Sequence, residues 1–151
     1  MEVYLASAAG LLSWCGKWRK IPTPLAHPTL LAACGADVAL ADSVNRLLYR
    51  QGRISTLPPG VEVLRCWRNQ LLTLSSETNC LTLYDAHDYP LVTSPAGIRP
   101  CDCAVFDCQV IVCGCEDGCL HIFSLPDLRE IAAYPVPGCP MRVAADGGVL
   151  T

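Results

Sequence analysis

The 151-residue sequence lacks long apolar runs, dense charge and any basic stripe. No segment approaches the roughly 18 consecutive apolar residues of a membrane-spanning helix, so no membrane span is expected. Charged residues make up only 17% of the chain and the net charge is −3, which argues against a nucleic-acid partner held by phosphate contacts. Periodic runs of charged helix formers are missing, as are a glycine-rich phosphate loop and a His-Glu-x-x-His motif. These absences point away from helical, membrane-spanning and nucleotide-binding proteins.

The N-terminal segment is apolar, but its charges stand in the wrong order for a secretory signal. Glu2 precedes the apolar residues 3–14, and Lys17, Arg19 and Lys20 follow them. A secretory signal has its cations before the apolar region. We therefore expect this segment to begin the fold and the protein to be cytoplasmic, with an atypical signal sequence as the alternative.

The residues that are abundant indicate β-structure. Apolar residues make up 52% of the chain, and 12 prolines and 11 glycines fall mostly between short apolar runs. Gly60, Gly97 and Gly138 end three similar proline-containing segments, which are spaced 37 and 41 residues apart. A repeat of about 40 residues built from four short strands is typical of a β-propeller blade.

Each repeat divides into four runs of the usual strand length. Strands are predicted at residues 29–34, 37–43, 46–51 and 54–57, then 61–67, 70–76, 80–85 and 90–94, then 101–106, 109–114, 119–124 and 130–134. The predicted fold class is all-β, a β-propeller of four-stranded antiparallel blades with about four blades present. The chain is predicted to form one propeller domain, with blades at residues 1–22, 23–60, 61–97 and 98–138 and the start of the next at 139–151.

The two ends of the sequence allow two architectures. Before Pro22 only three strands fit, so the first blade is predicted to lack its innermost strand. Residues 141–145 are predicted to form an innermost strand, which either completes that first blade in a closed four-bladed ring or continues a larger ring. We favour a partial propeller, because a ring of six or more blades needs roughly 240 residues. An open ring exposes an apolar flank and is expected to self-associate.

One part of the repeat resembles a known family. Residues 97–105, 110–114 and 120–125 are similar to the YVTN-type β-propeller repeat, whose unit opens with Gly-x-x-Pro, as Gly97 and Pro100 do here. Residues 80–85 resemble the third strand of that unit, which ends in aspartate. The second strand departs from the family pattern. The resemblance implies a propeller fold, and the family includes both binding proteins and lactonase-like enzymes.

Eleven cysteines form the most unusual feature of the composition, and six of them fall within 19 residues. Small buried packing is the favoured interpretation, because free cysteine is among the most buried residue types. Ligation of zinc or iron is a second interpretation, with Cys113, Cys115 and Cys119 as weak candidates, since a turn separates Cys115 from Cys119. Redox sensing or disulfides form the third, but an odd count without a signal peptide argues against a disulfide framework. No cofactor is otherwise expected.

Loops at one rim provide the candidate binding residues. Connections between second and third strands and connections between blades share one rim of a propeller. The candidates at this rim are Arg99, Arg142, His27, Glu77, Glu116 and Asp117. Arg99 and Arg142 occupy related positions and are predicted to hold a carboxylate or an acidic peptide, unless they are simply solvated rim charges. His121 alternates with apolar residues and is interpreted as a partly buried sheet residue.

These features favour one function and leave two alternatives open. The favoured function is non-catalytic: a binding or scaffold propeller that recognises a protein, a peptide or a small ligand through one rim. A lactonase-like hydrolase is the first alternative, although the rim positions carry no converging His and Glu set. A cysteine-rich metal-binding propeller is the second.

Overall fold

The computed structural model describes residues 3–7, 10–146 and 149–150, and in these residues all regular structure is β-strand. Blade 1 is a three-stranded antiparallel sheet of β1 (Val3–Ser7), β2 (Gly10–Trp14) and β3 (Trp18–Ile21). Blade 2 contains β4 (Leu30–Cys34), β5 (Asp37–Asp42), β6 (Leu47–Arg50) and β7 (Arg53–Thr56). Blade 3 contains β8 (Val61–Trp67), β9 (Gln70–Ser75), β10 (Cys80–Tyr84) and β11 (Pro90–Pro95). Blade 4 contains β12 (Pro100–Phe106), β13 (Gln109–Gly114), β14 (Cys119–Ser124) and β15 (Glu130–Pro135).

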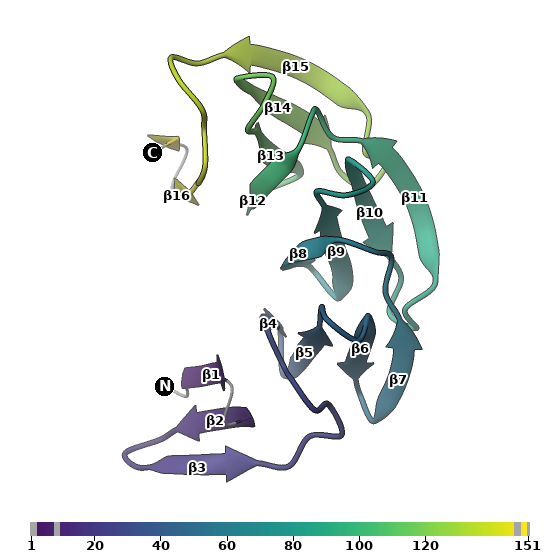
Figure 1. Ribbon diagram of the computed structural model, residues 1–151, viewed down its shortest axis with the longest axis vertical. Coiled ribbons are helices and arrows are strands. Elements are labelled where there is room, and N and C mark those ends of the chain that lie inside the picture. The colour runs from purple at the N-terminus through teal and green to yellow at the C-terminus, as the bar shows by residue number, and fades with distance from the viewer. Residues whose placement is uncertain (1–2, 8–9, 147–148, 151) are drawn as a thin grey trace.

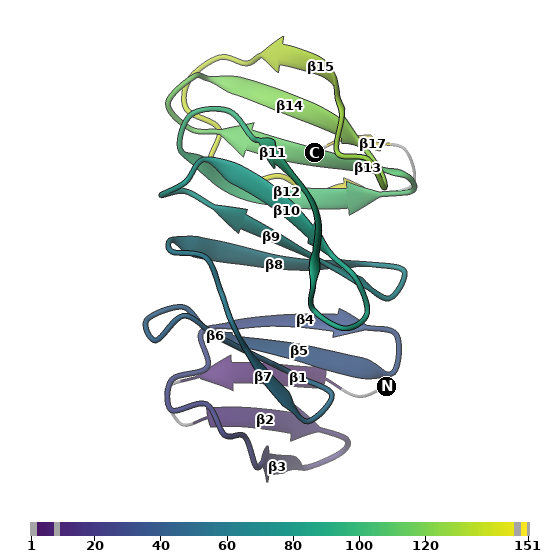
Figure 2. The same ribbon diagram turned by 90° about the vertical axis from the view of Figure 1, so that its right-hand side faces the viewer.

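The blades follow one another around an arc that is open on one side (Figure 1). The first strands of blades 2, 3 and 4 (β4, β8 and β12) lie side by side along the inside of the arc, and β7, β11 and β15 form its outside. Figure 2 shows the blades stacked in chain order from β1–β3 to β12–β15. Adjacent strands within each blade pair antiparallel. The predicted all-β propeller of antiparallel blades is therefore confirmed.

Apolar cores between neighbouring blades hold the arc together. Side chains alternate between the two faces of each strand, so every blade presents one apolar set to the blade before it and one to the blade after it. Leu72, Leu83, Val112 and Phe123 belong to the core between blades 3 and 4, and each is at most 1% exposed. Separate clusters lie between blades 2 and 3 and between blades 1 and 2. The high apolar content of the sequence is explained by sheets that are buried on both faces.

The C-terminal part differs from the prediction. Residues 141–144 form no strand, and β16 (Ala145–Asp146) begins only at the end of the predicted range. β16 pairs with β17 (Val149–Leu150), with Ala145 opposite Leu150 and Asp146 opposite Val149. At the equivalent place in blade 4, the end of β12 pairs with the start of β13 in the same register. The stretch before β16 has no ladder partner in the described chain. Single bonds hold it instead, from the Val143 N–H to the Asp102 carboxylate at 3.1 Å and from the Cys101 thiol to the Met141 carbonyl at 3.4 Å. A predicted innermost strand therefore fails to extend because it lacks a neighbour to pair with.

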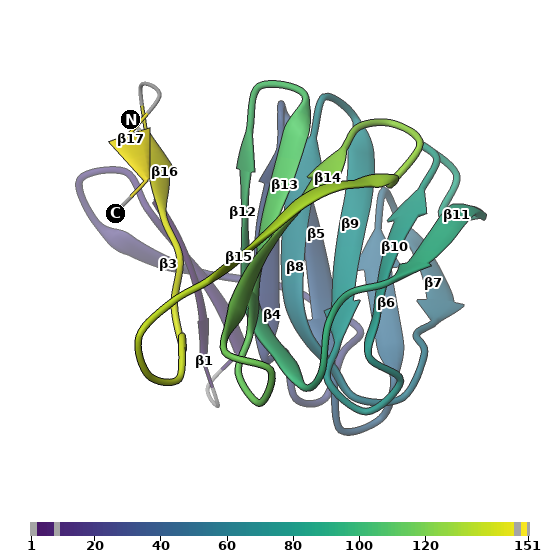
Figure 3. The ribbon, with the colours of Figure 1, turned by 90° about the horizontal axis from the view of Figure 1, so that it is seen from above.

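The alternative of a closed four-bladed ring is not what the described residues show. β16 contacts β12 and hydrogen-bonds with β17, whereas β1 belongs to the separate three-stranded sheet. Figure 3 shows β16 and β17 on the open side of the arc, away from the outer strands β7 and β11. On blade 1, Val3, Leu5, Trp14 and Trp18 are exposed. Self-association through an open edge stays a prediction.

In the described residues, no helix is long and apolar enough to cross a membrane. The cytoplasmic location and the absence of a nucleic-acid partner stay predictions.

Candidate functional site

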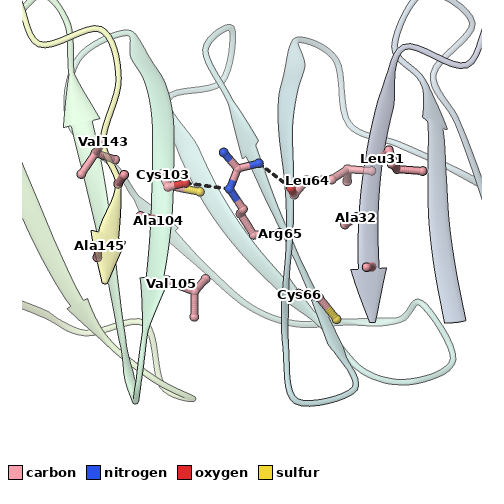
Figure 4. Close-up of a pocket in the computed structure, with 12 residues that line it drawn as sticks. Leu31, Ala32, Leu64, Arg65, Cys66, Cys103, Ala104, Val105, Val143 and Ala145 are labelled. Carbon is pink, nitrogen blue, oxygen red and sulfur yellow. Dashed lines mark hydrogen bonds between the residues drawn. The ribbon is translucent and has the colours of Figure 1, made fainter. Parts of the chain in front are cut away.

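The inner strands line a central cavity of about 490 Å³. Each of the strands β4, β8 and β12 contributes a short stretch near its middle, and the segment leading into β16 contributes a fourth. Figure 4 shows the side chains that line the cavity, which are Leu31, Ala32, Ala33, Leu64, Arg65, Cys66, Cys103, Ala104, Val105, Val143, Ala144 and Ala145. Small and apolar side chains predominate, and Arg65 is the charged residue among them.

Arg65 lies between β8 and β12 and is held by three hydrogen bonds. Its Nε donates to the Cys103 carbonyl at 2.9 Å, and one terminal nitrogen donates to the Leu64 carbonyl at 2.9 Å (Figure 4). The other terminal nitrogen binds the Asp102 carboxylate at 2.9 Å. A guanidinium has five N–H donors. Within the described chain these three bonds therefore leave two donors for a ligand.

Asp102 fixes the orientation of Arg65 and joins three elements. One carboxylate oxygen accepts from Arg65 and from the Cys103 N–H at 2.9 Å, and the other accepts from the Val143 N–H at 3.1 Å. The Asp102 side chain is 6% exposed, whereas that of Arg65 is 40% exposed. The pair thus presents its cation to the cavity and keeps its anion in the wall.

The cysteines around the cavity include one disulfide and one free thiol. Cys34 and Cys66 form a disulfide between β4 and β8, with their Cα atoms 5.4 Å apart. This corrects the expectation that the cysteines would not form disulfides. Cys34 is the last residue of β4 and Cys66 is the last but one of β8, and these equivalent inner strands lie side by side. An odd cysteine count does not reveal this relation between blades. Cys103 is a free buried thiol, and its burial raises its pKa to about 12, so it stays protonated and unreactive.

The predicted rim residues are only partly brought together. Arg99 forms an ion pair with Glu116 at 3.1 Å, and both side chains are more than half exposed. Arg142 is exposed, and the described residues show no contact between it and Arg99. His27 lies at the connection into blade 2, while Glu77 lies beside Gly60 in blade 3. Whether these residues bind a ligand stays a prediction.

Asp117, in contrast, has a structural role, because its carboxylate bonds the backbone of a neighbouring connection. One of its oxygens accepts from the Ile98 N–H at 2.8 Å, which ties the β13–β14 turn to the connection between blades 3 and 4. Asp42 has the same role in the connection between blades 1 and 2, where it accepts from the His27 N–H at 3.1 Å. Burial alone would raise the pKa of Asp117, but hydrogen bonds from Ile98 and His121 hold that pKa below its usual value.

In the connection between blades 2 and 3 the donor and acceptor are exchanged, so that the side chain donates and the backbone accepts. Pro59 occupies the equivalent place and has no N–H to donate. Here Ser75 ends β9 as Asp42 ends β5, and its hydroxyl donates to the Pro59 carbonyl at 2.7 Å. The polar residues at this rim are therefore selected in part by which backbone group each connection offers.

The cysteines predicted to bind metal do not form one site. Cys113 is fully buried on β13, and burial raises its pKa to about 12. Cys115 lies against Cys139, with the two Sγ atoms 2.7 Å apart. Cys119 instead lies with Asp117 and His121. The stretch that the sequence groups together is thus divided among a core position, a thiol pair and a mixed cluster.

We expect Cys115 and Cys139 to close a disulfide under mild oxidation. Their sulfurs are already close to the about 2.05 Å bond length, so little movement is needed. With diamide as oxidant, each thiol gives up one hydrogen, a sulfur–sulfur bond forms, and diamide is reduced to the hydrazine. Peptide mapping by mass spectrometry should find Cys115 joined to Cys139. Exposed Cys108 is the control and should stay unlinked within the chain. Finding Cys115 joined to another cysteine would contradict the geometry.

Comparison with known proteins establishes the fold. The designed Ika8 protein matches with a TM-score of 0.79 at 11% identity, over 99% of this chain and 51% of its own. AztD from Citrobacter koseri matches at 0.75 and 13% identity, over 98% of this chain and 48% of its own. An inactive virginiamycin B lyase from Staphylococcus aureus, solved with quinupristin, matches at 0.72 and 14% identity, over 97% of this chain and 57% of its own.

These similarities define the class as a β-propeller and define no more than that. The chain spans about half the length of these three structures. No protein-family model and no curated protein sequence matches it. Membership of the YVTN-type family therefore stays a prediction.

Proposed function

We propose that this propeller is a non-catalytic recognition module that binds a carboxylate-bearing segment of a protein or peptide in its central cavity. The observation that supports this most strongly is Arg65, a single cation held in place among small apolar side chains with two donors left over. A guanidinium that is already oriented loses little freedom when it binds a carboxylate in a two-pronged arrangement. The apolar wall around it suits the methylene groups of a Glu side chain.

The lining favours recognition over hydrolysis. The lactonase-like alternative needs a base, a metal or paired acid and base groups at the channel. Among the lining residues the titratable groups are Arg65 and the Cys103 thiol, and Cys66 is held in the disulfide. The similar structures include a lyase, so likeness of fold does not choose between these functions.

Short peptides that differ only in one central residue (Glu, Gln or Lys) test this proposal. We expect the Glu peptide to bind about 10-fold or more tightly than the Gln peptide, because a hydrogen bond to a charged group contributes about 1.5–3 kcal/mol. Fluorescence anisotropy measures the affinities. Arg65→Met should abolish the difference between the two peptides.

Arg129→Met is the matched control, because it removes the same charge from an exposed loop of blade 4. It should leave the preference for Glu unchanged. Equal binding of the Glu and Gln peptides, or a preference that survives in Arg65→Met, would refute the proposal.

A further inference from the structure

Three potential metal ligands converge on blade 4, outside the central cavity. Asp117 lies in the turn before β14, and Cys119 and His121 lie on β14 itself. Cys119 and His121 alternate along β14, so their side chains project from the same face of the strand, and the Asp117 side chain reaches them from the turn. Their ligand atoms (a carboxylate oxygen, Sγ and an imidazole nitrogen) all lie within 4.8 Å of one another.

The separations suit a single small ion. Nε2 of His121 lies 3.0 Å from Oδ2 of Asp117. In a tetrahedral zinc site with bonds of about 2.0–2.3 Å, two ligand atoms lie about 3.4–3.6 Å apart. Since no pair of ligand atoms in the trio is more than 4.8 Å apart, closure on an ion needs a shift of about 1 Å, shared between the side chains. The side chains of His121 and Asp117 are 12% and 18% exposed, so the cluster is shielded but reachable.

His121 also has the outer partner that zinc-binding histidines use. Its Nδ1 lies 2.6 Å from the Glu130 carboxylate at the start of β15. A carboxylate on the far nitrogen fixes the ring orientation and raises the basicity of the nitrogen that faces the metal. Glu130 thus aims Nε2 at Asp117 and Cys119.

Gly97 keeps the remaining side of the cluster accessible. A Cβ at this position would lie 2.6 Å from Nε2 of His121 and 2.7 Å from Oδ2 of Asp117. Any side chain there would occupy the space beside both ligand atoms. The connection between blades 3 and 4 therefore passes close to the trio, where the Ile98 N–H bonds Oδ2 of Asp117 at 2.8 Å, and Gly97 adds no side chain to it.

Blade 3 provides an internal comparison. Cys80 begins β10 as Cys119 begins β14, and both lie beside a turn of the same kind. Thr78 and Thr82 stand two residues either side of Cys80, where blade 4 has Asp117 and His121. Blade 3 thus repeats the thiol without the other two ligands, and Thr82 instead bonds Thr93 at 3.0 Å.

We propose that Asp117, Cys119 and His121 form a zinc site, with Glu130 as the positioning residue behind His121. Mixed sulfur, nitrogen and oxygen donors suit this borderline-soft ion. Three protein ligands leave a fourth tetrahedral position for water or a ligand atom. This site is separate from the Arg65 cavity and does not depend on the function proposed for it.

The test is titration of chelator-treated protein with Zn²⁺ by calorimetry and with Co²⁺ by absorption spectroscopy. One equivalent of each ion should bind, and Co²⁺ should give the thiolate-to-metal charge-transfer absorption of a cysteine ligand. Cys119→Ser should lose this absorption, whereas Cys80→Ser should keep it. Glu130→Gln should keep the absorption but weaken Zn²⁺ binding by about 10–100-fold, as the loss of an outer partner does.

Circular dichroism must show that each variant keeps its β-structure, and the Cys and Glu variants are chosen because Asp117 itself ties two blades. Three results would overturn the proposal. These are failure to bind one equivalent of Zn²⁺, a charge-transfer band that persists in Cys119→Ser, and a band that is lost in Cys115→Ser, which would assign the ion to the Cys115–Cys139 pair.

Discussion

Asp88→Asn should destabilise the protein by about 3 kcal/mol, because it removes the counter-charge of a fully buried arginine. Arg50 on β6 is 0% exposed, and its guanidinium reaches Asp88 in the β10–β11 loop at 3.4 Å and the Asn69 carbonyl at 2.7 Å. Its Nε has no hydrogen-bond partner in the described part of the chain. The loss of Asp88 would leave a buried charge with one neutral contact, which is among the most costly changes in a protein interior.

Urea denaturation measures this effect as a lower midpoint at unchanged slope. Asparagine is used because Asp88 has a positive φ of 66°, which asparagine tolerates. Asp107→Asn, at an exposed residue with a φ of 51°, is the matched control and should change stability by less than about 0.5 kcal/mol. The double variant Arg50→Met, Asp88→Asn should recover most of the loss, since an uncharged pair leaves no buried cation. A double variant less stable than Asp88→Asn alone would contradict this account.

Gly60→Ala should cost about 2–5 kcal/mol, from two independent causes. Gly60 has a φ of 66°, and a side chain in this left-handed region costs roughly 1–2 kcal/mol. A Cβ there would also lie 2.3 Å from the Cβ of Glu77 and 2.9 Å from its backbone nitrogen. Backbone atoms cannot rotate aside, so the turn between β9 and β10 must shift, at a further cost of about 1–3 kcal/mol.

Gly52→Ala separates the two causes. Gly52 has a φ of 77°, but a Cβ there would meet no atom within 4 Å. It should therefore show the backbone cost alone, and its urea midpoint should lie between those of the wild type and Gly60→Ala. Equal destabilisation by the two substitutions would show that the contact between Gly60 and Glu77 has no energetic weight.

The sequence was sufficient to predict the fold because a blade is a local object. Each strand pairs with the next one along the chain, so apolar alternation and the glycine spacing are visible without knowledge of distant contacts. The prediction of a strand at residues 141–145 was wrong for residues 141–144, which do not pair with a strand next to them in the described chain. An inner strand is stabilised by its partners, and the residues before Ala145 have no ladder partner in the described chain.

The candidate sites depend on contacts between blades, which spacing does not reveal. Arg65 was not predicted as a site residue, because its importance comes from Cys103 and Asp102, more than 35 residues away along the chain. The rim arginine Arg99 was a reasonable candidate by position, yet it is paired with Glu116.

His121 could have been found from the sequence. The pattern Asp117-Gly-Cys119-Leu-His121 places three ligand types at alternate positions of one strand and its turn. The apolar neighbours of His121, Leu120 and Ile122, favour a buried sheet residue, whereas the residues two and four positions before it indicate a ligand. The Cys34–Cys66 bond, in contrast, needs the lateral alignment of β4 and β8, which only the folded arc provides.

The most direct test of the central claim is to locate the bound peptide by NMR. Titration of isotope-labelled protein with the Glu-containing peptide should shift the amide signals of Ala33, Arg65, Ala104 and Ala144, which surround the cavity. Signals around the Arg99–Glu116 pair at the rim should move little. Shifts confined to that rim, with the signals of the inner strands unchanged, would contradict the assignment of the cavity as the recognition site.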